Sequence, residues 1–247
     1  MLRLISTFVV LAAALGSSQA APTGAPLPGQ YVRGDDSGTL TIRRDEQNKL
    51  VFEIDSIGGH CHECKVTGVI RGTIGYADRL IGDEDDSKCE ISFSSNPSSV
   101  VVKPIAEDEC REYCGFRAYF DGTYRRPSAT CSRSGRQALR DRFLLLYRAH
   151  RYPLATSTLQ TLIGECREFM GSIELDQVRN DLALSQYHNG DFSRCLETLD
   201  ATSAGEERDE EELMSVLQPC DADNYIDVAK ATWFNRALCK KAMSKLR

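Results

Sequence analysis

The chain has 247 residues and a formal net charge of −6, and 27% of its residues are charged. This acidic balance, with no basic stripe interleaved with aromatic residues, argues against nucleic acid and against an anionic membrane surface as partners. The length is sufficient for two modest hydrophobic cores.

The first 20 residues have the three parts of a secretory signal peptide. Arg3 precedes an apolar run from Leu4 to Leu15, and small residues up to Ala20 form a cleavage site. The run is shorter than the roughly 20 apolar residues of a membrane-spanning helix, so no membrane anchor is expected. We therefore predict a signal peptide over 1–20, a flexible N-terminus over 21–28, and a periplasmic or secreted protein.

Residues 29–126 alternate apolar and polar side chains, with turn sequences such as GDDSG and SNPSS between the runs. Strands are predicted over 30–34, 38–44, 49–55, 64–72, 89–95, 98–105 and 117–126, with a weaker candidate at 75–82. A short helix is predicted over 106–115. This spacing of strands favours an antiparallel β-barrel or sandwich, and closure into a barrel would remove exposed edges.

After a linker at 127–134, the apolar residues recur at helical spacing. Helices are predicted over 138–151, 153–170, 175–190, 191–200, 207–217 and 222–245. Pro153 suits the first turn of its helix and Asp191 suits an N-cap. The expected fold class is α+β with two domains: an antiparallel β-barrel or sandwich over 29–126, followed by an α-helical array over 135–247.

Two of the helical segments resemble each other at a constant offset along the chain. The aligned pairs are Tyr147 with Tyr187, Tyr152 with Phe192, Ala155 with Cys195, and Leu159 with Leu199. With Leu182-Ala183 in its first helix and Gly190 in its turn, the second copy resembles a tetratricopeptide repeat. The resemblance implies a TPR-like array whose helical hairpins stack on one another and bind other proteins.

The stretch CREYCGFRAYFDGTYRRP, residues 110–127, lies within this two-part layout. Together they resemble uncharacterised exported proteins of Gram-negative bacteria. The resemblance implies a protein of the cell envelope and assigns it no activity.

All ten cysteines follow residue 20, and an even number in an exported chain is typical of a disulfide framework. Cys220 and Cys239 flank one predicted helix and are therefore too far apart to pair with each other. If the last helix runs parallel to the third, the pairs Cys166–Cys220 and Cys195–Cys239 follow. In the β half, Cys64–Cys89 joins two strand starts. One of Cys110 and Cys114 pairs with Cys131 and the other with Cys61, and we assign Cys114–Cys131 and Cys61–Cys110.

The stretch GGHCHEC, residues 58–64, places His60, Cys61, His62 and Cys64 together. Thiolate and imidazole ligands suit zinc or cuprous copper. Adjacent residues of an extended chain point to opposite faces, so four ligands converge only if Gly58-Gly59 supplies a turn. A redox CxxC opens a helix, whereas this motif precedes a predicted strand. We favour the interpretation that both cysteines form disulfides and both histidines are exposed. A metal site is the alternative.

No catalytic or cofactor-binding residue is assigned, because the sequence contains no G-x-S-x-G, H-E-x-x-H or phosphate-binding glycine loop. The arginines of the first long helix are spread around it and are interpreted as a solvated face; they are Arg136, Arg140, Arg142, Arg148 and Arg151. The prediction is a non-enzymatic, exported binding protein without cofactor that acts on another envelope or extracellular protein, with an inhibitor or immunity role as one form. The alternative is a periplasmic zinc- or copper-binding protein that uses GGHCHEC.

Overall fold

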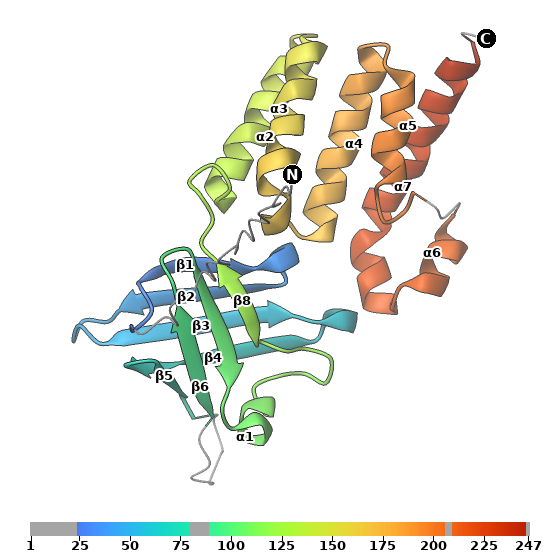
Figure 1. Cartoon of the computed structure of the whole chain (residues 1–247). Helices are drawn as coiled ribbons and strands as arrows, with labels where there is room; N and C mark the ends of the chain where they lie inside the picture. The colour runs from blue at the N-terminus through green and yellow to red at the C-terminus, as the bar shows by residue number, and fades with distance from the viewer. Residues whose placement is uncertain (1–23, 80–88, 206–208, 246–247) are drawn as a thin grey trace, which may run out of the picture.

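The computed structural model describes residues 24–79, 89–205 and 209–245. Within these ranges the first half of the chain is a closed antiparallel β-barrel of eight strands in sequence order (Figure 1). The strands are β1 (Gly29–Arg33), β2 (Gly38–Arg44), β3 (Leu50–Ile57), β4 (Glu63–Arg71), β5 (Ile74–Ala77), β6 (Glu90–Ser95), β7 (Ser99–Pro104) and β8 (Gly122–Arg125). Closure comes from β1, which pairs with β8 at Val32–Arg125 and Arg33–Tyr124.

The barrel interior is packed with side chains, as expected for a barrel of this size. Alternate residues of each strand point inward, so that Leu40 and Ile42 of β2 and Phe52 and Ile54 of β3 are all buried. The rings of Phe52 and Phe93 lie 5.2 Å apart. A Cβ atom at Gly75 would come within 2.5 Å of the Phe93 ring, so glycine at this position makes room for the aromatic pair.

The helix α1 (Glu107–Arg111) closes one end of the barrel, away from the helices of the second half (Figure 1). Two disulfides hold this end together. Cys89–Cys110 ties α1 to the start of β6, and Cys64–Cys114 ties the segment after α1 to β4. Residues 117–121, which were predicted to begin the last strand, are irregular, and β8 starts only at Gly122.

The second half is helical. Its elements are α2 (Arg133–Arg148), α3 (Tyr152–Cys166), a 3₁₀ turn η3 (Arg167–Phe169), α4 (Ser172–His188), α5 (Phe192–Asp200), α6 (Glu210–Val216) and α7 (Pro219–Ser244). Pro153 lies in the first turn of α3, and the Asp191 side chain caps α5 by accepting a hydrogen bond from the Arg194 N–H, as predicted. None of the described helices has both the length and the apolar character that crossing a membrane requires.

The overall α+β content agrees with the prediction, but the TPR-like array does not. Repeat arrays stack equal hairpins on their neighbours, whereas the helices of the α2–α3 hairpin have 16 and 15 residues and those of the α4–α5 hairpin have 17 and 9. The last helix, α7, has 26 residues and packs against both α4 and α5. The helical core is also divided into separate clusters, one of which includes Val32 of the barrel. The offset between the two sequence copies therefore reflects one pair of similar turns, not a repeated unit.

All ten cysteines are paired, and four of the five predicted pairs are wrong. The observed disulfides are Cys61–Cys220, Cys64–Cys114, Cys89–Cys110, Cys131–Cys166 and Cys195–Cys239. Only the last agrees with the sequence analysis.

The four errors have physical causes in the chain path. Cys166–Cys220 fails because α2 and α3 form an antiparallel hairpin, which returns Cys166 to Cys131 beside the start of α2. That pairing also excludes Cys114–Cys131. Cys64–Cys89 and Cys61–Cys110 fail because α1 folds over the barrel end and brings Cys110 and Cys114 to Cys89 and Cys64.

Three further contacts fix the barrel to the helices. Arg125 of β8 forms an ion pair of 2.7 Å with Glu168 in η3. Arg136 of α2 lies 3.9 Å from Asp36, which follows β1. The third contact is the disulfide between Cys61 and Cys220, which lies at the start of α7. These attachments hold the two halves as one body. The predicted signal peptide at 1–20 lies outside the described residues.

Candidate functional site

The GGHCHEC stretch forms the connection between β3 and β4, which includes a single 3₁₀ turn η2 (Gly59–Cys61). The metal alternative built on His60, Cys61, His62 and Cys64 is wrong, because both sulfurs are engaged in disulfides and no thiolate is available. Over the described ranges, no group of three or more His, Cys, Asp or Glu side chains is placed to hold a metal ion.

The same stretch instead attaches the barrel to α7. His60 and Cys61 both adopt left-handed backbone angles, with φ of 60° and 56°, which cost non-glycine residues of order 1 kcal/mol each. The Asp221 carboxylate accepts a hydrogen bond of 2.9 Å from the His60 N–H, and Asn224 Nδ2 donates to Cys61 Sγ at 3.2 Å. The strained turn is therefore held in place by the first turns of α7.

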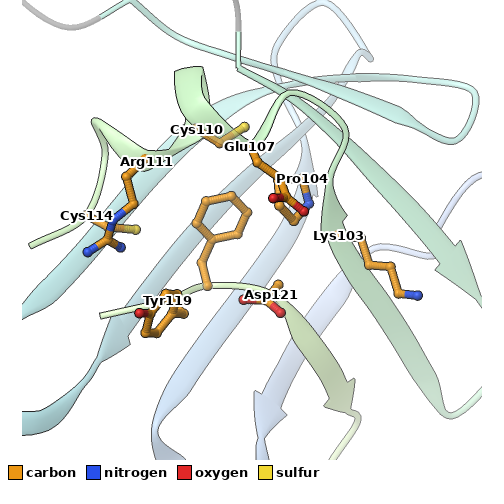
Figure 2. A pocket seen from close by; sticks show the side chains of 9 residues that line it. Lys103, Pro104, Glu107, Cys110, Arg111, Cys114, Tyr119 and Asp121 are labelled. Carbon is orange, nitrogen blue, oxygen red and sulfur yellow. The ribbon is translucent and has the colours of Figure 1, made fainter. Parts of the chain in front are cut away.

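A pocket of about 390 Å³ opens at the α1 end of the barrel. Its lining comes from the end of β7, from α1 and from the segment before β8; the residues are Lys103, Pro104, Glu107, Cys110, Arg111, Cys114, Tyr119, Phe120 and Asp121 (Figure 2). Figure 2 shows Glu107 and Asp121 on facing sides of this pocket, with Arg111 and Tyr119 together at one rim and Lys103 at the other.

The loop of residues 114–121 beside the pocket is held from within by Arg111. The Arg111 guanidinium donates to the carbonyls of Ala118 at 2.6 Å and Gly115 at 2.8 Å. The guanidinium carbon also lies 5.0 Å from the centre of the Tyr119 ring, a cation–π distance. One arginine thus fixes both the backbone of the loop and the orientation of an aromatic side chain.

The loop is also anchored to the barrel. The Tyr119 carbonyl accepts hydrogen bonds from Arg33 Nη1 at 2.5 Å and from the Ser56 hydroxyl at 2.9 Å. At the other end, the Gly115 N–H donates to the Glu63 carbonyl at 2.8 Å, next to the Cys64–Cys114 disulfide. The loop therefore has little freedom to lose when a partner binds.

Two aromatic side chains project from this rigid loop into solvent. Phe116 is 80% exposed and Tyr119 is 59% exposed. Ile105, which precedes α1 in the chain, is 52% exposed. Large aromatic residues supply most of the binding energy at protein interfaces when a partner buries them. Their exposure on a fixed loop is a feature of a binding surface.

The pocket lining carries two carboxylates, Glu107 and Asp121, and two cations, Lys103 and Arg111. In the part of the chain that the structure describes, neither carboxylate accepts a hydrogen bond or forms an ion pair, whereas Arg111 donates to two carbonyls of the loop. Asp108 and Glu109 extend the acidic character along the first turn of α1. Chemically, the pocket suits a basic side chain flanked by apolar groups.

The sequence alone does not predict this site. Most of its residues lie within the stretch 110–127, whose only signal is the resemblance to exported proteins, and Lys103, Pro104 and Glu107 lie just before it. No local signal marks it, because the alternation over Ala118, Tyr119 and Phe120 is the one that a strand would give. The chain matches no protein-family model, no curated protein and no solved structure.

Proposed function

We propose that this protein is an exported, disulfide-stabilised binding protein of the cell envelope that docks a partner protein at the α1 end of its barrel. The observation that carries the proposal is the rigid loop 114–121, which presents Phe116 and Tyr119 to solvent. Preorganisation lowers the entropic cost of association, so a small aromatic surface of this kind can give useful affinity.

The proposed location rests on the cysteines. Five disulfides join all ten cysteines of the chain. Disulfides persist in oxidising compartments and are rare where cytosolic thiols reduce them. A periplasmic or secreted protein fits this chemistry.

The charge of the pocket indicates what the partner should present. Glu107 and Asp121 offer two unpaired carboxylates beside the apolar surface of Tyr119 and Phe120. A lysine or arginine that projects from the partner would insert its apolar stem against the rings and bring its charge to the carboxylates. The protein's own net charge of −6 would assist the approach of a basic partner.

Site-specific photo-crosslinking tests this proposal. A photoreactive phenylalanine is placed at Phe116 in the full chain, and the matched control carries it at Leu154, which is 50% exposed on α3. One discrete adduct from position 116 that is absent from position 154 is expected. The adduct yield should fall at least fivefold when Glu107→Gln and Asp121→Asn are combined with the probe at 116.

Equal labelling from both positions, or no adduct from position 116, would overturn the proposal. If the captured partner is an enzyme, its activity is measured with and without the protein. Loss of that activity, reversed by Phe116→Ala, would establish an inhibitor or immunity role.

A further inference from the structure

A second and larger cleft, of about 520 Å³, lies between the barrel and the helices. One wall is the face of α2 that carries Arg133, Gln137 and Arg140. These positions are four and three residues apart and therefore share one helix face. The opposite walls include Thr39 of β2 and Gln177 of α4.

The interpretation of all the arginines of α2 as a solvated face is therefore wrong for Arg136. Arg136 has a side chain that is 6% exposed, and its guanidinium makes a bidentate pair with Glu174, with both N···O distances at 2.9 Å. Its third nitrogen, Nη1, donates to the Cys131 carbonyl at 2.9 Å. Arg136 forms part of the lining, where it is paired with Glu174 and lies 3.9 Å from Asp36.

Arg133 and Arg140 are in a different state. Over the described ranges neither donates a side-chain hydrogen bond or forms a direct ion pair, although both line the cleft. Each interacts electrostatically with one carboxylate at longer range, Arg133 with Asp36 and Arg140 with Asp181. Counting charges in the lining, three arginines face two carboxylates, Asp36 and Glu174, which leaves a net charge of +1. A guanidinium is a planar donor that matches carboxylate and phosphate oxygens.

We propose that this cleft binds a ligand with two oxyanion groups, one held by Arg133 and the other by Arg140. Seven residues of helix separate the two arginines by about 10 Å along the axis, at 1.5 Å per residue. The anionic groups of the ligand should therefore be separated by several bonds. Gln177 and Thr39 offer amide and hydroxyl groups to the part of the ligand between them, and Gln137 lies beside them with its Nε2 donating to Asp141 at 2.9 Å.

The cleft has a fixed shape, because the barrel and the helices are tied to each other at more than one place. The Arg125–Glu168 ion pair and the Cys61–Cys220 disulfide restrict movement of its walls. Its volume falls in the range of small-ligand sites. This site is separate from the α1 end of the barrel, so the inference does not depend on the proposed docking function.

The test uses isothermal titration of the full, oxidised protein at low ionic strength with two probes, triglutamate and inorganic tripolyphosphate. We expect at least one probe to bind with a Kd below about 1 mM. The preferred probe identifies the ligand as carboxylated or phosphorylated. Arg133→Gln combined with Arg140→Gln should weaken binding at least tenfold.

The matched control replaces Arg142 and Arg148, which are exposed on the same helix and outside the cleft, with Gln. It removes the same charge and should change the Kd less than twofold. A measurement on the unaltered protein guards against misfolded variants: the side-chain amide signals of Gln137 and Gln177 should shift on titration. Binding of neither probe, equal weakening by the control pair, or unshifted amide signals would overturn the proposal.

Discussion

Cys61, in the connection between β3 and β4, is bonded to Cys220 in the first turn of α7, 159 positions further along the chain. This bond joins the barrel to the last helix. Asp221, the residue after Cys220, accepts a hydrogen bond from the backbone of His60 on the same turn. The junction therefore combines a covalent and a polar contact at one point.

Replacing Cys61 and Cys220 together by serine should lower the free energy of unfolding by roughly 2–4 kcal/mol, because the disulfide restricts the unfolded chain. Urea denaturation followed by the fluorescence of Trp233, the one tryptophan of the chain, measures the change. Hydrogen exchange should accelerate at η2 and at the start of α7, while Cys64–Cys114 and Cys89–Cys110 keep the barrel strands protected. An unchanged free energy would show that the junction does not depend on the bond.

The buried carboxylate of Asp176, which is 1% exposed, should be the most sensitive polar position of the helical half. It accepts hydrogen bonds from Arg179 Nη1 at 2.7 Å, from the Ser203 N–H at 2.8 Å and from the Tyr225 hydroxyl at 2.7 Å. Asp176→Ala strands these donors and should cost about 3–5 kcal/mol in a urea titration.

Two companion variants calibrate that result. Tyr225→Phe removes one bond to a charged acceptor and should cost about 1.5–3 kcal/mol. Asp223→Ala removes an exposed carboxylate of α7 and should change stability by less than about 0.5 kcal/mol. A loss for Asp176→Ala no larger than for Asp223→Ala would contradict the network.

Alkaline pH should destabilise the protein through two tyrosines. Burial raises the pKa of both Tyr124 and Tyr225 well above the usual value near 10, and the hydrogen bond to Asp176 adds to the rise for Tyr225. Because the unfolded state loses these protons first, their contribution is complete below about pH 10 and falls above it, by up to about 1.4 kcal/mol per pH unit for each group. Absorbance at 295 nm should show at least two of the nine tyrosines ionising only as the protein unfolds. Ionisation of all nine near pH 10 in the folded state would refute this.

Gly58 should be required for the position of the docking loop. A Cβ atom there would lie 2.0 Å from the Arg117 carbonyl oxygen and 2.6 Å from the Ala118 Cα. Gly58→Ala should displace residues 115–121, reduce stability by roughly 1–3 kcal/mol and lower crosslinking from position 116. The adjacent Gly59 has no atom within 4 Å of its ideal Cβ, so Gly59→Ala is the matched control and should leave both measurements unchanged.

Peptide mapping without reduction should recover the pairs Cys61–Cys220 and Cys131–Cys166, and the intact mass should be ten hydrogens below that of the reduced chain. No thiol should alkylate in denaturant before reduction. A Cys166–Cys220 peptide would show that α3 and α7 are arranged as the sequence analysis supposed and not as the structure has them.

The sequence predicts the strands well where one face is buried. The alternation in β2, β3 and β4 sets which side chains enter the barrel, and those segments appear close to their predicted bounds. It fails at residues 117–121, where the apolar residues alternate but the backbone is fixed by Arg111 and Arg33, which no local pattern reveals.

The disulfides and both sites depend on contacts between distant segments. Cys195–Cys239 follows from the supposition that the last helix runs parallel to α4, which places Cys239 near the start of α5. Cys61–Cys220 joins the barrel to α7, and no feature of either segment fixes how the two halves dock. The arginine cleft could not be predicted for the same reason. Arg133 and Arg140 line one cleft only because the barrel lies against α2.

The connectivity of the cysteines has a consequence for biosynthesis. A chain that is oxidised as it emerges would first meet Cys61 and Cys64, which are separated by two residues, and would close a small loop between them. In the native protein these neighbours belong to different bonds, one of which waits for residue 220. Reaching the native state therefore requires either that Cys61 stays reduced during most of synthesis or that an early bond is exchanged by thiol–disulfide attack. The yield of native protein in a cell should therefore depend on disulfide isomerisation and not on oxidation alone.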